Sequence, residues 1–191
     1  YCSNNTVSKS SAQVFSGTIA LGHMQAHRCS MFDPPVIAAI LWAILLGGLG
    51  GLLTAIGPWY HALKKPSWQP PDWLFGPAWT IILGLAAWAA VLAWNGADND
   101  AERTTVIILY TSNFVAHFLW SPLFFTLRRP DWALIEVVFL WASVLSLLVS
   151  LRTYSPLASW LILPYFIWVS FAACLNLAIV KLNGPFGGKD R

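Results

Sequence analysis

The chain has 191 residues, of which 57% are hydrophobic and only 10% are charged, whereas soluble domains usually carry about 25% charged residues. Its formal net charge of +3 is not gathered into a basic stripe, which argues against nucleic acid as a partner. Three scattered cysteines, Cys2, Cys29 and Cys174, are too few for a disulfide framework or a zinc site, so the composition favours an integral membrane protein that lies in a lipid bilayer.

Residues 1–30 differ in composition from the rest of the chain. They are rich in Ser and contain neither Asp nor Glu, as organelle transit peptides do. The run Met31-Phe32-Asp33-Pro34-Pro35, however, looks like a natural start. We therefore expect residues 1–30 to be an extension that is disordered or not native.

Five apolar spans follow, separated by charged and Pro-rich segments. Each is about 20 residues long, which is the length of a membrane-spanning helix. The runs lack the alternation of barrel strands, so helices are favoured. The sequence predicts an all-α membrane domain over residues 31–183, with a short basic tail at 184–191. The expected spans are about 34–56, 74–94, 104–127, 131–151 and 157–182.

The Lys and Arg residues fall unequally on the two sides of these spans. Short loops that carry Lys and Arg tend to stay in the cytoplasm. The richer side holds Lys64, Lys65, Arg128, Arg129, Lys181, Lys189 and Arg191. The poorer side holds Arg103 and Arg152, with Lys9 and Arg28 added by the extension. We expect the C-terminus to be cytoplasmic and the N-terminus to be outside or luminal.

The twelve tryptophans are the most unusual feature of the composition. An aromatic belt at the membrane interfaces explains those near the ends of the spans, which are Trp59, Trp73, Trp94, Trp132 and Trp160. Four others fall well inside spans, namely Trp88, Trp120, Trp141 and Trp168. Two interpretations of these stay open, which are packing of the bundle and a cavity lined by aromatic rings for a large, flat, apolar ligand.

The third span carries polar and aromatic residues at steps of three or four, so that they share one helix face: Tyr110, Asn113, His117, Trp120 and Phe124. Asn and His are costly in hydrocarbon and normally face a bundle interior or a cavity. This face predicts a ligand site, with interhelical hydrogen bonds as the alternative. The fifth span has a similar series with a step of four, comprising Pro164, Trp168, Ala172 and Asn176.

Two further patterns concern packing. Gly47 and Gly51 form a small-xxx-small pattern, which marks either a contact within the bundle or a dimer interface. Glu136 is the one acid well inside a span, and we expect it to reach the interface or to pair with a neighbour.

The loop between the first two spans, residues 57–73, contains four prolines and several aromatic residues. Proline restricts the backbone and lowers the entropy that ordering costs. We expect an ordered loop, acting either as a lid over the cavity or as a rigid turn. The chain contains no GxSxG, Walker A or HExxH motif, which argues against a hydrolase or an ATP-driven pump.

Several of these motifs together resemble the tryptophan-rich sensory protein, or translocator protein, family over about residues 31–183. The resemblance is carried by Trp59-Tyr60, Lys65-Pro66-Ser67-Trp68, Pro70-Pro71, Trp79-Thr80, Trp120-x-Pro122-Leu123-Phe124-Phe125, Pro164-Tyr165, Trp168, Phe171-Ala172 and Leu175-Asn176. It implies a five-helix membrane protein, usually a homodimer, that binds porphyrins such as protoporphyrin IX beneath its first loop. In animals such proteins also bind sterols such as cholesterol and benzodiazepine-type ligands.

The resemblance also implies which residues form the pocket: Tyr60, Pro70, Trp79, Trp120, Trp168, Ala172 and Leu175. The expected function is binding of tetrapyrroles for sensing, sequestration or transport, with a part in stress regulation. In some bacterial members the matches of Trp79 and Trp168 are associated with light-dependent porphyrin breakdown. A porphyrin-degrading enzyme that uses these two candidates is therefore the alternative, and a scaffold without a ligand is a further one.

The chain departs from the family pattern at two places. Where the family usually has Asn three residues before the tryptophan of the third-span motif, this chain has His117, and Asn113 lies one turn earlier. Imidazole ligates metals as a carboxamide does not, so His117 is a candidate haem ligand. The segment from Leu175 to Lys181 also lacks the Tyr of the animal sterol pattern, so sterol binding is not carried over.

Overall fold

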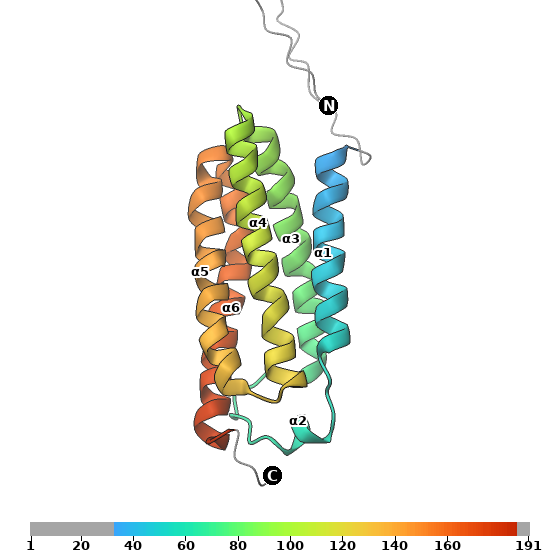
Figure 1. Cartoon of the computed structure of the whole chain (residues 1–191), viewed down its shortest axis with the longest axis vertical. Coiled ribbons are helices and arrows are strands. Elements are labelled where there is room, and N and C mark those ends of the chain that lie inside the picture. The colour runs from blue at the N-terminus through green and yellow to red at the C-terminus, as the bar shows by residue number, and fades with distance from the viewer. Residues whose placement is uncertain (1–32, 187–191) are drawn as a thin grey trace, which may run out of the picture.

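The computed structural model describes residues 33–186, and within them it contains helices and no strand (Figure 1). The expectations for residues 1–30 and for the last part of the tail lie outside this range. Five long helices run side by side along the bundle. They are α1 (Pro34–Leu53), α3 (Phe75–Gly96), α4 (Asp100–Ser121), α5 (Pro130–Tyr154) and α6 (Pro156–Asn183). All five are long and apolar enough to cross a membrane, so the all-α five-helix prediction is confirmed.

Three short elements join the long helices at the end of the bundle that contains the first loop. They are α2 (Pro58–Ala62), the single 3₁₀ turn η1 (Asp72–Leu74) and the π-helical turn η2 (Pro122–Thr126), which continues α4. The predicted span edges are right to within a few residues, except that α4 begins earlier than expected.

The early start of α4 has a local cause. Asn99 caps the helix by accepting a hydrogen bond from the Glu102 N–H at 3.0 Å, and the Glu102 carboxylate accepts in return from Asn99 and from the Asp98 N–H. This reciprocal capping box satisfies amides that the first turn of a helix leaves unpaired. The charged first turn of α4 therefore belongs to the helix, although a hydropathy window excludes it.

The bundle core lies between α3, α4, α5 and α6, whereas α1 stands at the edge against α3 and α4 (Figure 1). Only Ala39 and Leu46 of α1 are buried. On α3 the buried positions include Ala86, Ala89 and Ala93, whose small side chains allow close helix packing. The C-terminal half of α1 borders a cavity that separates it from the other helices.

The outer surface is apolar, which is the reverse of a soluble protein. Large side chains point outward from all five helices, among them Ile44, Ile81, Ile108, Phe139 and Ile167. In a bilayer these side chains contact lipid, and burying them against another part of the chain is not required. Trp88 belongs to this surface, because it is 56% exposed on α3. The expectation that Trp88 lines a cavity or packs inside the bundle is therefore wrong.

The first loop, the α4–α5 turn and the end of α6 lie at one end of the bundle, and the other two turns lie at the opposite end (Figure 1). The basic residues described at the loop end are Lys64, Lys65, Arg128, Arg129 and Lys181, against Arg103 and Arg152 at the other. This arrangement agrees with the topology behind the orientation prediction. Which end is cytoplasmic stays a prediction.

Candidate functional site

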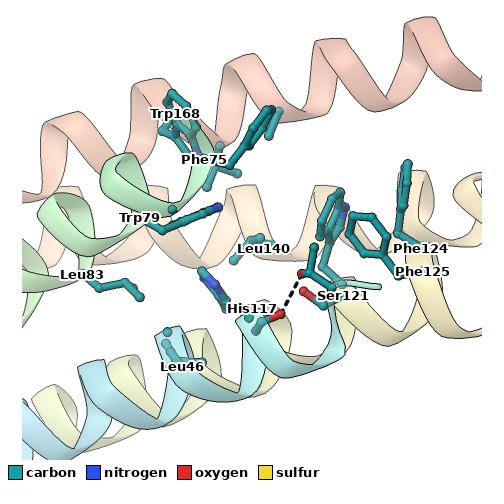
Figure 2. A pocket seen from close by; sticks show the side chains of 18 of the residues that line it. Leu46, Phe75, Trp79, Leu83, His117, Ser121, Phe124, Phe125, Leu140 and Trp168 are labelled. Carbon is teal, nitrogen blue, oxygen red and sulfur yellow. Dashed lines mark hydrogen bonds between the residues drawn. The ribbon is translucent and has the colours of Figure 1, made fainter. Parts of the chain in front are cut away.

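A cavity of about 680 Å³ opens within the bundle near the loop end, and its wall is formed by all five long helices, the first loop and η2 (Figure 2). Ligand pockets in proteins usually measure about 300–1,000 Å³. The wall is predominantly apolar, with few polar side chains. Residues of α1 in the wall include Leu46, Gly47, Gly50 and Gly51, and Thr54 follows directly after the helix. A cavity of this size and character suits an extended apolar ligand with a small number of polar groups.

Aromatic rings form one side of the cavity. Figure 2 shows Phe75 and Trp79 from α3 beside Trp168 from α6. The rings of Phe75 and Trp168 have centroids 5.7 Å apart, and those of Trp79 and Trp168 are 6.2 Å apart, both nearly perpendicular. Edge-to-face contacts of this kind fix ring orientations and leave ring faces available. The wall therefore presents rigid aromatic surfaces for a flat ligand.

Two indole N–H groups in this wall have no hydrogen-bond partner. Trp120 Nε1 and Trp168 Nε1 are buried and unpaired within residues 33–186. The other inner tryptophan, Trp141, instead donates to Ser170 at 2.9 Å and so serves packing between α5 and α6. An unpaired buried donor costs about 1–3 kcal/mol, so the positions of Trp120 and Trp168 depend on ring packing and not on a hydrogen bond of the indole.

His117 lies in the cavity wall next to Trp79 (Figure 2). Its ring centroid is 4.6 Å from that of Trp79, and its Nδ1 is 2.7 Å from the Tyr165 hydroxyl of α6. The Tyr165 hydroxyl donates to Asn113 Oδ1 at 3.2 Å, and Asn113 Nδ2 donates to Ser143 of α5 at 2.9 Å. A continuous hydrogen-bonded network thus connects the cavity wall with three helices.

The mouth of the cavity is covered by the first loop, which is ordered as expected. The Tyr60 hydroxyl donates to Asp72 Oδ1 at 2.9 Å, and Gln69 Nε2 donates to both of these oxygens at 3.1 Å. Lys65 Nζ lies 3.7 Å from Asp72 and 3.6 Å from the centroid of the Tyr60 ring. Tyr60 and Asp72 also line the cavity, so this cluster joins the two ends of the loop at the mouth.

The middle of the loop is held to the end of α6. The Asn183 side chain accepts from the Lys64 N–H at 2.7 Å and donates to the Lys64 carbonyl at 2.8 Å. Trp68 packs edge-on against Phe171 of α6, with centroids 5.7 Å apart. The loop is therefore anchored at both its backbone and its side chains, as a lid or a rigid turn requires.

The Tyr60 cluster gives a pH-dependent prediction. Burial, together with the hydrogen bond to Asp72 and its negative charge, raises the pKa of Tyr60 from 10.0 to about 12. Because the folded pKa is the higher one, the stabilising contribution is complete below pH 10 and is lost as the pH rises through about 12. We expect the difference in phenolate absorbance between the native chain and Tyr60→Phe to titrate near pH 12, and titration near pH 10 would show that the cluster does not form.

Most of the residues predicted for the site come together in this cavity. Those in its wall are Tyr60, Trp79, His117, Trp120, Trp168, Ala172 and Leu175. Pro70 and Asn113 are not part of the wall. Asn113 is fully buried behind His117, where it acts through Tyr165 and Ser143.

The two predicted polar faces both lie inside the bundle, but their members have different roles. On α6, Trp168, Ala172 and Asn176 line the cavity, whereas Pro164 lies on the exposed surface and α6 continues through it. With its amide oriented so that both atoms have partners, Asn176 donates to the Pro130 carbonyl and accepts from the Leu134 N–H, each at 3.1 Å. Asn176 therefore also holds the first turn of α5.

Sequence reasoning missed part of the wall. Phe75 precedes Trp79 by four residues and Ser121 follows His117 by four, so helical spacing was a sufficient signal for both. Phe125 enters the wall because η2 is a π-turn, in which the Leu127 N–H reaches back five residues to the Pro122 carbonyl at 2.8 Å. The glycines of α1 were interpreted as a packing pattern, and their place in the cavity wall was not predicted.

The expectation for Glu136 is wrong. Its carboxylate neither reaches the interface nor pairs with a neighbour, because the residue is buried and both oxygens lack a hydrogen-bond partner in the part of the chain that the structure describes. Gly47 and Gly51, by contrast, lie in the cavity wall of α1, and only Gly47 faces a close neighbour, with Leu83 of α3 3.5 Å from the place of a Cβ. A homodimer through this pattern stays a prediction.

Comparison with known proteins gives a consistent result. Residues 38–182 match the TspO/MBR family. The chain is 38% identical to the tryptophan-rich protein TspO of Archaeoglobus fulgidus over 151 residues, which are 78% of this chain and 96% of that protein. It is 32% identical to the human translocator protein over 134 residues, 70% and 79% of the two chains, and 32% identical to protein CrtK of Rhodobacter capsulatus over 148 residues, 78% and 92%.

Proposed function

The chain belongs to the TspO/MBR family and is an integral multi-pass membrane protein, and from this premise we propose that it binds tetrapyrroles such as protoporphyrin IX in the cavity of its bundle. The observation that carries the proposal is the apolar cavity of about 680 Å³, whose wall includes the rings of Phe75, Trp79 and Trp168. Porphyrin binding is also what the sequence motifs imply. The proposed function is the binding of tetrapyrroles, which would serve their sensing, sequestration or transport.

A tetrapyrrole matches the cavity in shape and chemistry. Its macrocycle is flat and apolar, so it can pack against the aromatic surface that Phe75, Trp79 and Trp168 form in the cavity wall. The N–H groups of Trp120 and Trp168 are buried and unpaired, and in this proposal ligand binding turns them toward the carboxylates of protoporphyrin IX, where a hydrogen bond to a charged group contributes about 1.5–3 kcal/mol. The small side chain of Ala172 leaves space beside Trp168.

The first loop controls access in this proposal. Tyr60 and Asp72 stand at the mouth, and Asn183 holds the loop to α6, so entry from the loop end requires these contacts to open. The basic residues near this end favour its placement on the cytoplasmic side of the membrane.

A titration with a matched control tests the proposal. The full chain in detergent is titrated with protoporphyrin IX in the dark, and tryptophan quenching and the Soret band are followed. Trp168→Phe keeps an aromatic ring but removes the unpaired donor, so we expect about tenfold weaker binding. Trp88→Phe makes the same change on the outer surface and is expected to bind like the native chain.

The outcomes separate the alternatives. Absence of saturable binding would contradict the proposal and favour a scaffold. Equal weakening by Trp88→Phe and Trp168→Phe would show that the ligand is not in the cavity. The close contact of Trp79 and Trp168 is the observation that favours a degrading enzyme as second candidate. In that case illumination of the complex would change its spectrum, and Trp79→Phe would suppress the change.

A further inference from the structure

The charged side chains of the bundle are divided unequally between its two ends (Figure 1). Within residues 33–186 the loop end carries five basic residues and two acids, Asp72 and Asp131, which is a formal charge of +3. The opposite end carries two basic residues and four acids, which is a formal charge of −2. These four acids are Asp33, Asp98, Asp100 and Glu102. The two ends of the bundle therefore differ in the sign of their charge.

Both acids at the loop end already have a basic partner. Asp72 lies 3.7 Å from Lys65 Nζ, and Asp131 accepts from Arg129 Nε at 2.8 Å. Three exposed cations remain whose charged groups make no ion pair and no cation–π contact within residues 33–186. They form the basic rim of the bundle and are Lys64, Arg128 and Lys181. The surplus positive charge of the loop end therefore belongs to the basic rim.

Arg128 has a backbone conformation that is unfavourable for a residue with a side chain. Its φ is 54°, in the left-handed region that favours glycine. The turn around it is fixed, because the Leu127 N–H donates to the Pro122 carbonyl at 2.8 Å. On the other side the Arg129 N–H donates to the Leu123 carbonyl at 3.0 Å. A strained residue that is exposed at a fixed position points to a function of its side chain.

The other two cations of the basic rim lie at the end of α6. Asn183 accepts from the Lys64 N–H at 2.7 Å and donates to the Lys64 carbonyl at 2.8 Å. These bonds hold Lys64 beside the last turn of α6, and Lys181 is exposed in that turn. None of the three cations lines the cavity, so the basic rim is a separate surface.

Exposed apolar side chains at the same end indicate the depth of the basic rim in the bilayer. Leu127, which precedes Arg128, is exposed, as are Trp73 and Trp132. The Trp132 ring lies 4.4 Å from the Arg129 guanidinium. Tryptophan gathers where the hydrocarbon of a bilayer meets its headgroups. The cations therefore lie at the level of the lipid phosphates, within reach of the headgroups of the surrounding lipids.

We propose that the basic rim is a binding surface for the headgroups of anionic phospholipids such as phosphatidylglycerol. Lys and Arg near a membrane surface attract anionic lipids, and basic clusters beside membrane helices bind their headgroups. The guanidinium of Arg128 suits a phosphate because its planar N–H groups can donate two parallel hydrogen bonds. The negatively charged opposite end repels the same headgroups, so binding is confined to the leaflet at the loop end.

Spin-labelled lipids test the proposal without any tetrapyrrole, so its outcome is independent of the function proposed above. The full chain is reconstituted in phosphatidylcholine bilayers with a trace of spin-labelled phosphatidylglycerol or phosphatidylcholine. The motionally restricted fraction of each label in the EPR spectrum gives its relative association constant. We expect about fivefold preference for phosphatidylglycerol at low ionic strength, as one cation per bound headgroup predicts, and a smaller preference at high salt.

Matched variants locate the surface. Arg128→Gln is expected to lower the preference, and the triple change Lys64→Gln, Arg128→Gln and Lys181→Gln is expected to abolish it. Arg152→Gln is the control, because it removes an exposed charge without an ion pair at the opposite end, and it is expected to keep the native preference. Equal association of both labels with the native chain would overturn the proposal, as would equal loss in Arg128→Gln and Arg152→Gln.

Two further arms separate headgroup binding from folding and from capture of a free anion. Arg128→Gly removes the charge and relieves the left-handed backbone, so we expect a higher unfolding temperature in detergent together with a lower lipid preference. A native preference in Arg128→Gly would contradict a headgroup contact at this residue. Inorganic phosphate added at constant ionic strength is expected to leave the restricted fraction unchanged, and displacement of the labelled lipid would show a site for phosphate itself and overturn the assignment to lipid.

Discussion

Replacing Ala172 with leucine is expected to weaken porphyrin binding strongly while the bundle stays folded. Ala172 lies in the cavity wall one turn after Trp168 on α6, so the larger side chain enters the space beside the indole ring. Forcing added methylene groups into an occupied site costs about 1–3 kcal/mol, which corresponds to roughly 10–100-fold weaker binding. Tryptophan quenching on titration with protoporphyrin IX measures the loss.

The control is Ala142→Leu on α5, where the same side-chain change is made at an exposed position. It is expected to bind protoporphyrin IX like the native chain. Both variants are expected to unfold at nearly the native temperature, because Ala172 borders open space and not a packed core. Native affinity in Ala172→Leu would place the ligand outside the cavity.

The fold was accessible from the sequence because the bilayer imposes a simple rule. Backbone groups in hydrocarbon must pair within a segment, so a long apolar run is a helix whatever its neighbours are. The helices α5 and α6 begin at Pro130 and Pro156, one residue before the predicted starts of these spans, and proline is well suited to the first helical position. The start of α4 at Asp100 did not follow, because its capping box lies among charged residues that hydropathy assigns to a loop.

From the sequence, the site could be predicted only for residues that share one face of a helix. Spacing placed His117 and Trp120 on one face and Trp168 and Ala172 on another, and the structure brings both faces to one cavity. It could not say which tryptophans have partners, because that depends on other helices, as the bond from Trp141 to Ser170 shows. The hydrogen bond of His117 likewise depends on Tyr165, which lies 48 residues further along the chain.

Polar residues within the spans also proved to divide between two roles. Asn113 and Asn176 both hydrogen-bond across helices, and such bonds hold membrane bundles together. Only Asn176 also contributes to the cavity wall. Asn113 and Asn176 have the same residue type and a similar spacing in the sequence. Which of them borders the cavity is therefore seen only when the arrangement of the helices around it is known.

Gly96→Ala tests the opposite end of the bundle and is expected to lower the free energy of unfolding by about 3 kcal/mol. A Cβ at Gly96 would overlap the carbonyl oxygen of Tyr154, which is backbone at the end of α5 and cannot rotate away. The ends of α3 and α5 must then separate, which disturbs the packing of Ala93 beneath them. Thermal unfolding in detergent without ligand measures the effect.

Gly84→Ala is the matched control, and its expected effect has the opposite sign. Gly84 lies inside α3 with nothing within 4 Å of the position of a Cβ. Alanine is favoured over glycine in a helix by about 1 kcal/mol, so Gly84→Ala is expected to be neutral or stabilising. Equal effects at the two positions would mean that helix propensity decides both and that α3 does not pack against the Tyr154 backbone. Opposite effects would show that close backbone contact away from the cavity holds α3, and with it Trp79, in position.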